Sequence, residues 1–425
     1  MSIEDYYHVD HWEAMAAMVV NHGARTNLHT LSAPGQGKDG MAVTVTEAFR
    51  EQCADWEHYR NFGNADIRAA QHEGIDIKGL FDDGVAGPDH PYLNKDRAYT
   101  TTKRFAMYPE KGVGMVNWSE YFMGGKDIRK AIMQSLAERR IGEHYLGDGW
   151  SQICSDNMSR HKGLGDKATP AEANRRCWIY LDDGCLAEMH GQMSDGGRCA
   201  ISWAELAQQD FKLYPGDIPI DLTKIPDWDC PKGVNSSIAS WLSNRPSLMN
   251  TLDTERIKQE DYAYSTNRSV EYFSKIFLTC QYLGQEAYDF VFKPMAHGCI
   301  GPGPAEEFIQ TLKLLKQEID YNAVKADGDN APLPEDGSYR MGILYMAIGA
   351  LSTGMHFKAK TSREIFKWIG RLTQFSPELP IVFAKNLEGS AKRNKGIESI
   401  LCDPDSGYVE FKQKYHKIDT FKQAA

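Results

Sequence analysis

Basic residues that stand beside aromatic residues are the side chains of this sequence with the clearest potential for chemistry or binding. They occur at Arg175 and Arg176 near Trp178, at Lys367 beside Trp368, and at Lys392 and Arg393 near the end of the chain. Cationic groups can follow a phosphate backbone, and aromatic faces can stack on bases without reading their order. The combination predicts binding of single-stranded nucleic acid.

Further basic residues lie on an expected helix and beside the first aromatic cluster. In the segment 126–146, Ile128, Ile132 and Leu136 repeat every four residues and form an apolar stripe. Arg139 and Arg140 fall outside that stripe. We predict phosphate contacts at Arg139, Arg140, Arg175 and Arg176, with a solvated basic face as the alternative.

The segment Gly35-x-Gly37-Lys38 contains the glycine and lysine of a phosphate-binding loop. The complete pattern needs a preceding strand, a fixed spacing and a Ser or Thr after the lysine, and none of these is evident here. The sequence therefore predicts an ordinary loop over residues 29–40.

Other motifs of catalysis or metal binding are not evident either. His8, Asp10, His11 and Glu13 are metal-binding residue types, but they would not share one face of a helix. The sequence contains no nucleophile elbow, zinc-protease motif or kinase motif. We expect no catalytic residue, cofactor or metal, and a protein that is not an enzyme.

The elements that position these residues are expected to be mostly helices. A helix starting after Asp10 as N-cap and one capped by Thr46 open the chain, and Thr169-Pro170 reads as the start of a helix through residue 190. Apolar periodicity predicts later helices over 269–284 and 304–321. Strand-like runs occur at 97–108 and 113–118.

These elements predict a mainly α protein, with two helical lobes and a loop-rich N-terminal region containing a few short strands. The proline-rich segment 215–235 marks a boundary between the lobes. The predicted division is an N-terminal arm or helix pair (1–60), an N-terminal lobe (61–214), a linker (215–235), a C-terminal helical lobe (236–402) and a tail (403–425).

Composition sets the broad class. The chain has 425 residues, 42% hydrophobic residues and a net charge of −10. The acidic balance argues against a simple basic-surface binder, although a basic cleft within an acidic shell can still attract a polyanion. No apolar run is long enough for a membrane span. The nine cysteines include no C-x-x-C pair and are expected to be reduced.

The second half of the sequence resembles the nucleoproteins of nonsegmented negative-strand RNA viruses, the rhabdovirus type in particular. The resemblance is carried by Asp261-Tyr262-Ala263-Tyr264-Ser265, by GILYMAIGALSTGM (342–355) and by the Trp-aliphatic-Gly, proline and Ala-Lys series of 366–401. It implies RNA contact at Arg393, with Lys392 alongside, and at Lys258. It also implies two helical lobes that clamp single-stranded RNA.

The leading hypothesis is therefore a viral nucleoprotein that polymerises along single-stranded genomic RNA without sequence specificity. Its partners would be that RNA, other copies of the chain in a ring or helical polymer, and a viral polymerase cofactor, with no membrane span. Its location would be the virion and the host cytoplasm. A shell-forming viral or phage capsid subunit is the alternative, and a helical enzyme whose site is not visible in the sequence is the second alternative.

Overall fold

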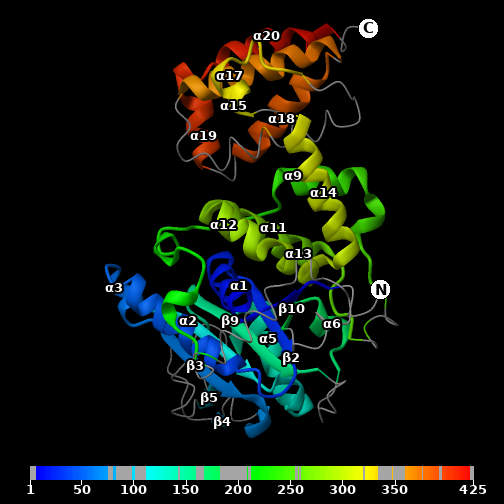
Figure 1. The fold of residues 1–425 in the computed structure, drawn as a ribbon. Coiled ribbons are helices and arrows are strands. Elements are labelled where there is room, and N and C mark those ends of the chain that lie inside the picture. Colours follow the sequence, from blue (N-terminus) through cyan, green and yellow to red (C-terminus); the bar gives the residue numbers. More distant parts are fainter. Residues whose placement is uncertain are drawn as a thin grey trace. The chain divides into compact units, whose positions relative to one another are not determined.

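A computed structural model describes most of the chain. The described residues are 6–74, 80–82, 98–100, 112–141, 144–158, 167–181, 208, 212–253, 257, 260–318, 321–333, 347, 359–375, 377–391 and 395–421. They divide into two compact units (Figure 1). Unit 1 comprises residues 1–230 and 250–305, and unit 2 comprises residues 231–249 and 306–425.

Unit 1 is built on a six-stranded sheet in which every neighbouring pair of strands is parallel. The strand order is β1-β10-β2-β9-β6-β3. The strands are β1 (His8–Val9), β2 (Asn27–Ser32), β3 (Gly63–Arg68), β6 (Val113–Ser119), β9 (Gly149–Asn157) and β10 (Cys177–Leu181). Parallel strands require crossover connections, and helices lie in several of these connections, between β1 and β2, β2 and β3, β6 and β9, and β9 and β10.

Helices pack on both faces of this sheet (Figure 1). One face carries α1 (His11–Ala24), α2 (Lys38–Gln52), α11 (Asn267–Leu283) and α13 (Lys293–Ile300). The other face packs against α5 (Lys126–Glu138), whose Ile128, Ile132 and Leu136 join a core that includes Trp118 and Trp178. A short helix, α3 (Glu57–Arg60), precedes β3.

Unit 2 is helical in the part of it that the structure describes. Its core includes Ile365, Trp368, Phe383 and Phe411, none of which is more than slightly exposed. Its helices are α9 (Ser236–Asn244), the greater part of α14 (Pro302–Glu318), α15 (Tyr321–Ala326), α17 (Ala359–Arg371), α18 (Leu379–Ala391), α19 (Lys395–Cys402) and α20 (Tyr408–Phe421).

The expected fold class is wrong for unit 1, which is α/β and not a loop-rich lobe attached to helices. The predicted helix from Thr169 is only α6 (Pro170–Ala173), after which Cys177–Leu181 forms strand β10. The helix expected to start at Thr46 begins at Lys38 instead, so Thr46 lies inside it. Asp10 does cap α1, and α5 and α11 form where apolar periodicity predicts helices.

The structure divides the chain into two units, and the domain limits predicted from the sequence remain a prediction. Among the described residues, no helix combines the length and the apolar character that a membrane span requires.

Candidate phosphate-binding site

The carboxyl ends of four strands meet at one edge of the sheet. In the strand register, Ser32 lies opposite Asn157, and Ser119 lies between Ser155 and Arg68. After β2 the chain crosses to β3 on one side, whereas after β9 it crosses to β10 on the other side of β2. In open α/β sheets, ligands bind at the carboxyl ends of strands where the connections diverge in this way.

A tight loop joins β2 to α2 at this edge. It consists of Ala33-Pro34-Gly35-Gln36-Gly37, and its central part is exposed. Gly35 has φ +81° and Gly37, the N-cap of α2, has φ +73°, a backbone conformation that glycine adopts without strain. No side chain caps the first turn of α2, so its backbone N–H groups are available to an anion.

Lys38 is the first residue of α2 and turns back to the end of the sheet. Its Nζ atom donates to Ser32 Oγ at 2.6 Å, to the Ala33 carbonyl at 3.3 Å and to Asn157 Oδ1 at 2.9 Å. Burial lowers the pKa of the Lys38 ammonium to about 8, while the carboxyls of Asp156 and Asp39 oppose that shift. The loop thus presents a cation and backbone N–H groups at one point.

Residues 32–39 correspond to the phosphate-loop pattern G-x-x-x-x-G-K-[ST] with two changes. Gly37 and Lys38 match, Ser32 stands at the first glycine, and Asp39 stands where Ser or Thr is usual. The interpretation of this segment as an ordinary loop is wrong, because strand β2 precedes it and helix α2 follows it. The loop is also held from α1, where His11 Nε2 lies 3.1 Å from the Gln36 carbonyl oxygen.

A buried charged network lies directly behind Lys38. Arg176 Nη1 lies 3.0 Å from His29 Nδ1, and His29 Nε2 lies 2.9 Å from Asp156 Oδ2. Because arginine can only donate, His29 Nδ1 accepts, so its proton is on Nε2 and is donated to Asp156. Burial raises the pKa of the Asp156 carboxyl to about 8. Asp156 is adjacent in the chain to Asn157, which contacts Lys38.

Polar residues of β3 and β6 complete the edge. Asn117 and Ser119 of β6 contact Asp66 of β3 and Asp39 of α2 through hydrogen bonds of 2.5–3.5 Å. Glu120 follows β6 directly, is exposed, and has φ +55°, which is uncommon for a residue other than glycine. Its backbone N–H donates to the Ser155 carbonyl at 2.9 Å and fixes it beside β9.

The residues predicted to contact phosphate lie elsewhere. Arg139 ends α5 and donates to the Gly147 and Trp150 carbonyls, at 2.8 and 2.6 Å, and Arg140 pairs with Glu138 at 2.7 Å. Arg175 donates to the Ala171 carbonyl. Arg176 is 1% exposed and lies over the Tyr121 ring at 3.8 Å.

The remaining predicted contacts, Lys258, Lys392 and Arg393, lie outside the described residues. Of the four predicted residues that the structure describes, none lies on the loop itself, although Arg176 belongs to the buried network behind Lys38. Contact of the predicted residues with RNA stays an untested prediction. The residues that line the site were missed, although Gly37-Lys38 offered a signal for them.

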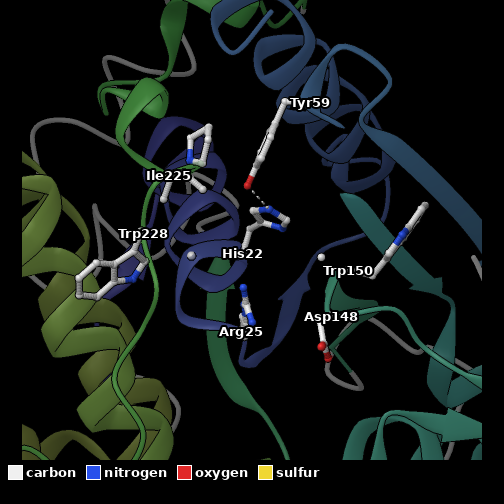
Figure 2. A pocket seen from close by; sticks show the side chains of 10 residues that line it. His22, Arg25, Tyr59, Asp148, Trp150, Ile225 and Trp228 are labelled. Atoms are coloured by element: carbon white, nitrogen blue, oxygen red, sulfur yellow. Dashed lines mark hydrogen bonds between the residues drawn. The ribbon is translucent and has the colours of Figure 1, made fainter. Parts of the chain in front are cut away.

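A cavity on unit 1 lies at the opposite, amino-terminal edge of the sheet (Figure 2). It is lined by the end of α1, including His22, and by the start of β9, including Trp150. Its volume of about 50 Å³ admits only a few water molecules. Figure 2 shows His22 and Tyr59 pointing toward each other, joined by a contact of 3.3 Å. This cavity is not a nucleotide site.

In unit 2, Asp327, Asp329 and Glu364 lie close enough to hold a metal ion. The Lys367 ammonium already pairs with two of these carboxylates, at 3.3 Å from Asp329 and 2.8 Å from Glu364. One of the three negative charges of this acidic group is therefore balanced by Lys367.

No family model and no curated protein matches the chain. Among solved structures, it is similar to a "putative ATPase" from Cytophaga hutchinsonii, with TM-score 0.38, 11% identity, and coverage of 72% of this chain and 89% of the other. It is also similar to a full-length MCM homologue from Methanopyrus kandleri, with TM-score 0.31, 10% identity, and coverage of 67% of this chain and 54% of the other. Similarity at this level assigns no activity to the chain.

The resemblance to viral nucleoproteins is wrong. The resemblance implied two helical lobes, whereas unit 1 is built on a six-stranded parallel sheet. Other predictions are corrected together with this resemblance. They are the nucleoprotein and capsid functions, the location in a virion, and the prediction of a protein that is not an enzyme. The alternative of a helical enzyme is wrong in its fold.

Proposed function

We propose that the chain binds a nucleoside triphosphate at the loop 33–37 and hydrolyses its terminal phosphoanhydride. The single observation that carries this proposal is the strand–loop–helix unit with Lys38 at the start of α2. A helix N-terminus and successive backbone N–H groups attract phosphate oxygens, and a lysine at this position reaches the β- and γ-phosphates.

The proposed reaction requires charge stabilisation more than covalent chemistry. Phosphoryl transfer builds negative charge on the transferred group and on the leaving oxygen, and positioned cations and N–H donors lower that barrier. Lys38 supplies the cation in this site. Asn157 and Ser32, which hold the Lys38 ammonium at 2.9 and 2.6 Å, set its position at the sheet edge.

Glu120 is our proposed base. In the reaction, water attacks the γ-phosphorus, the bond to the β–γ bridging oxygen breaks, and the Glu120 carboxylate accepts the proton of the water before passing it to solvent. Support comes from its position directly after β6, at the edge where β2 and β9 end, and from its exposure. Its left-handed backbone is the kind of outlier that accumulates at functional sites.

Fluorescence polarisation with a labelled ATP analogue, together with phosphate release from each of the four nucleoside triphosphates, tests the proposal. Loss of the charged hydrogen bonds in Lys38→Met is expected to weaken binding by about 10- to 150-fold, since such bonds contribute about 1.5–3 kcal/mol. Lys130→Met is the matched control, because Lys130 is an exposed lysine on α5 that pairs with Asp127, away from the loop.

Absence of binding to all four nucleotides at millimolar concentration would overturn the proposal, as would equal affinity of Lys38→Met and the wild type. Nucleotide binding with no phosphate release would support the proposed binding site and contradict the proposed hydrolysis. Contact with nucleic acid and self-association, which the sequence predicted, stay predictions. Sizing of the protein with nucleotide and with a single-stranded oligonucleotide would test both.

A further inference from the structure

Two carboxylates converge beside the proposed nucleotide site. Asp39 lies in the first turn of α2, and Asp66 lies on β3. Ser119 Oγ is 3.1 Å from Asp39 Oδ1 and 2.5 Å from Asp66 Oδ1. Asn117 Nδ2 is 3.5 Å from the first of these oxygens, 3.2 Å from the second and 2.9 Å from Ser119 Oγ.

The cluster has too few hydrogens for its acceptors. Ser119 has one hydroxyl hydrogen for two carboxylate oxygens, and the Asn117 amide has two hydrogens for three acceptors. Asn117 is 2% exposed, and its Oδ1 atom has no hydrogen-bond partner among the described residues. A half-turn of the amide brings Oδ1 to the side of the two carboxylates, where a cation bound by these oxygen atoms would satisfy it. A hard divalent cation takes oxygen ligands of this kind.

The sequence also supports a cation site, because two residue types of the usual phosphate-loop site have changed places here. Phosphate-loop proteins hold magnesium with the Ser or Thr that follows the lysine and with an Asp at the end of a neighbouring strand. Here the residue after Lys38 is Asp39, and the residue at the end of β6 is Ser119. The hydroxyl and the carboxylate are both present and in contact, with their positions reversed, and Asp66 adds a second carboxylate.

Arg68, at the end of β3, faces both carboxylates. Its Nη2 atom is 3.6 Å from Asp39 Oδ2, and its Nε atom is 3.7 Å from Asp66 Oδ2. Its side chain is 45% exposed. These are long contacts of a flexible, half-exposed side chain, so the guanidinium can leave the carboxylates at little cost.

We propose that Asp39, Asp66, Ser119 and Asn117 form a divalent-cation site that fills before nucleotide binds, and that Arg68 competes with the cation for the two carboxylates. The site deepens the proposed nucleotide site, on which its role rests. In the usual arrangement a hydroxyl on the loop relies on phosphate oxygens to complete the shell around magnesium. Two convergent carboxylates give the protein its own anionic ligands, so the cation does not depend on the nucleotide.

The test is titration of the full chain with Mn²⁺ and no nucleotide, in which electron paramagnetic resonance measures free Mn²⁺. Asp39→Asn and Asp66→Asn are each expected to weaken binding by at least about tenfold, since each removes an anionic ligand. Arg68→Gln is expected to tighten binding by about two- to fivefold, the size of an exposed ion-pair contact. A gain of affinity cannot arise from misfolding, so this variant keeps the test decisive if an Asp variant unfolds.

Two controls separate this site from other acidic groups. Asp55→Asn changes an exposed aspartate outside the cluster and is expected to leave binding unchanged. Asp329→Asn disrupts the acidic group of unit 2, and the site on unit 1 is expected to survive it.

Polarisation with the labelled ATP analogue in EDTA, on the same proteins, distinguishes the two proposals. Nucleotide binding in EDTA without Mn²⁺ binding in the absence of nucleotide would overturn the cation site and leave the nucleotide site standing. Mn²⁺ binding that depends on Asp39 and Asp66, without any nucleotide binding, would overturn the nucleotide site and leave the cation site standing. Mn²⁺ affinity that is unaltered in Asp39→Asn, Asp66→Asn and Arg68→Gln would overturn the cation site outright.

Discussion

The charge of Lys38 should make nucleotide affinity depend on pH in a range where most lysines are fully protonated. Burial lowers the pKa of Lys38 to about 8, against about 10.4 for a free lysine. A bound polyphosphate stabilises the ammonium, so binding above pH 8 must take up a proton. The affinity is therefore expected to be highest below pH 8 and to fall as the pH rises.

The size of the fall follows from the fraction of Lys38 that is protonated. With a pKa of about 8, that fraction drops from about three quarters at pH 7.5 to about 3% at pH 9.5. The expected loss of affinity between these two values is about 25-fold, or roughly 1.9 kcal/mol. The second ionisation of a phosphate group, near pH 6, is complete throughout this range.

Polarisation titrations with the labelled ATP analogue from pH 7 to pH 9.5 measure this dependence. Lys38→Arg is the informative variant, because its guanidinium stays protonated throughout and should flatten the profile whatever its absolute affinity. Burial also raises the pKa of Asp156 to about 8, so a shallower slope from this carboxyl is expected to remain in Lys38→Arg. A flat wild-type profile, or an equally steep profile in Lys38→Arg, would refute the reasoning.

Two further predictions concern stability. Burial lowers the pKa of His22 to about 3, so the unfolded chain binds a proton below pH 6.5 that the folded chain does not. The free energy of unfolding should fall by roughly 2.3 kcal/mol between pH 6.5 and 4.5, and His22→Gln should lack that part of the fall in urea denaturation. Arg129 and Glu172 form a buried bidentate pair at 2.9 and 2.8 Å. Arg129→Leu should cost about 3–5 kcal/mol by leaving Glu172 unpaired, and the double variant with leucine at both positions should cost less; an equal or larger loss in the double variant would contradict this.

Local signals predicted several elements of unit 1 well. Asp10 caps α1 through a side-chain bond to the Glu13 N–H, and Thr169 caps α6 in the same way. The periodicities of α5 and α11 reflect helices with one buried face, which is the pattern that sequence reading detects best. These helices depend on neighbours within one or two turns.

The parallel strands escaped prediction because their pattern is not local. β9 reads GWSQICSDN, a largely polar run, yet its central residues are buried. Their polar groups are satisfied by distant elements, as when the Ser135 hydroxyl of α5 donates to Gln152 Oε1. β10 follows a strong helix start, and its five residues are all buried, so the run shows no strand-like alternation and cannot be told from a buried helix by periodicity. Without β2, the loop before Lys38 lacked the strand that identifies a phosphate loop.

The exchange of residue types between Asp39 and Ser119 is a second reason why the sequence did not reveal the site. The pattern tests residue 39 for a hydroxyl, and the hydroxyl is on a strand about eighty residues later, 3.1 Å from Asp39 Oδ1. Only the fold shows that Asp39 and Ser119 lie in contact and together supply the carboxylate and the hydroxyl of the site. Lys258 was chosen by resemblance alone, whereas Lys392 and Arg393 were chosen from the set of basic residues and by resemblance, and all three lie outside the described residues.

The strand order also constrains how the protein can be made. β2 leaves the ribosome long before its two neighbours, β9 and β10, which begin only at Gly149 and Cys177. β2 has no partner in the sheet until about residue 157 has emerged, and β1 has none until about residue 181, so their backbone groups are open to pairing with other chains. Synthesis at 5–20 residues per second leaves this interval at roughly 10 s or more. A nascent chain with this topology depends on chaperone cover, or on slow and dilute expression, to reach its native state.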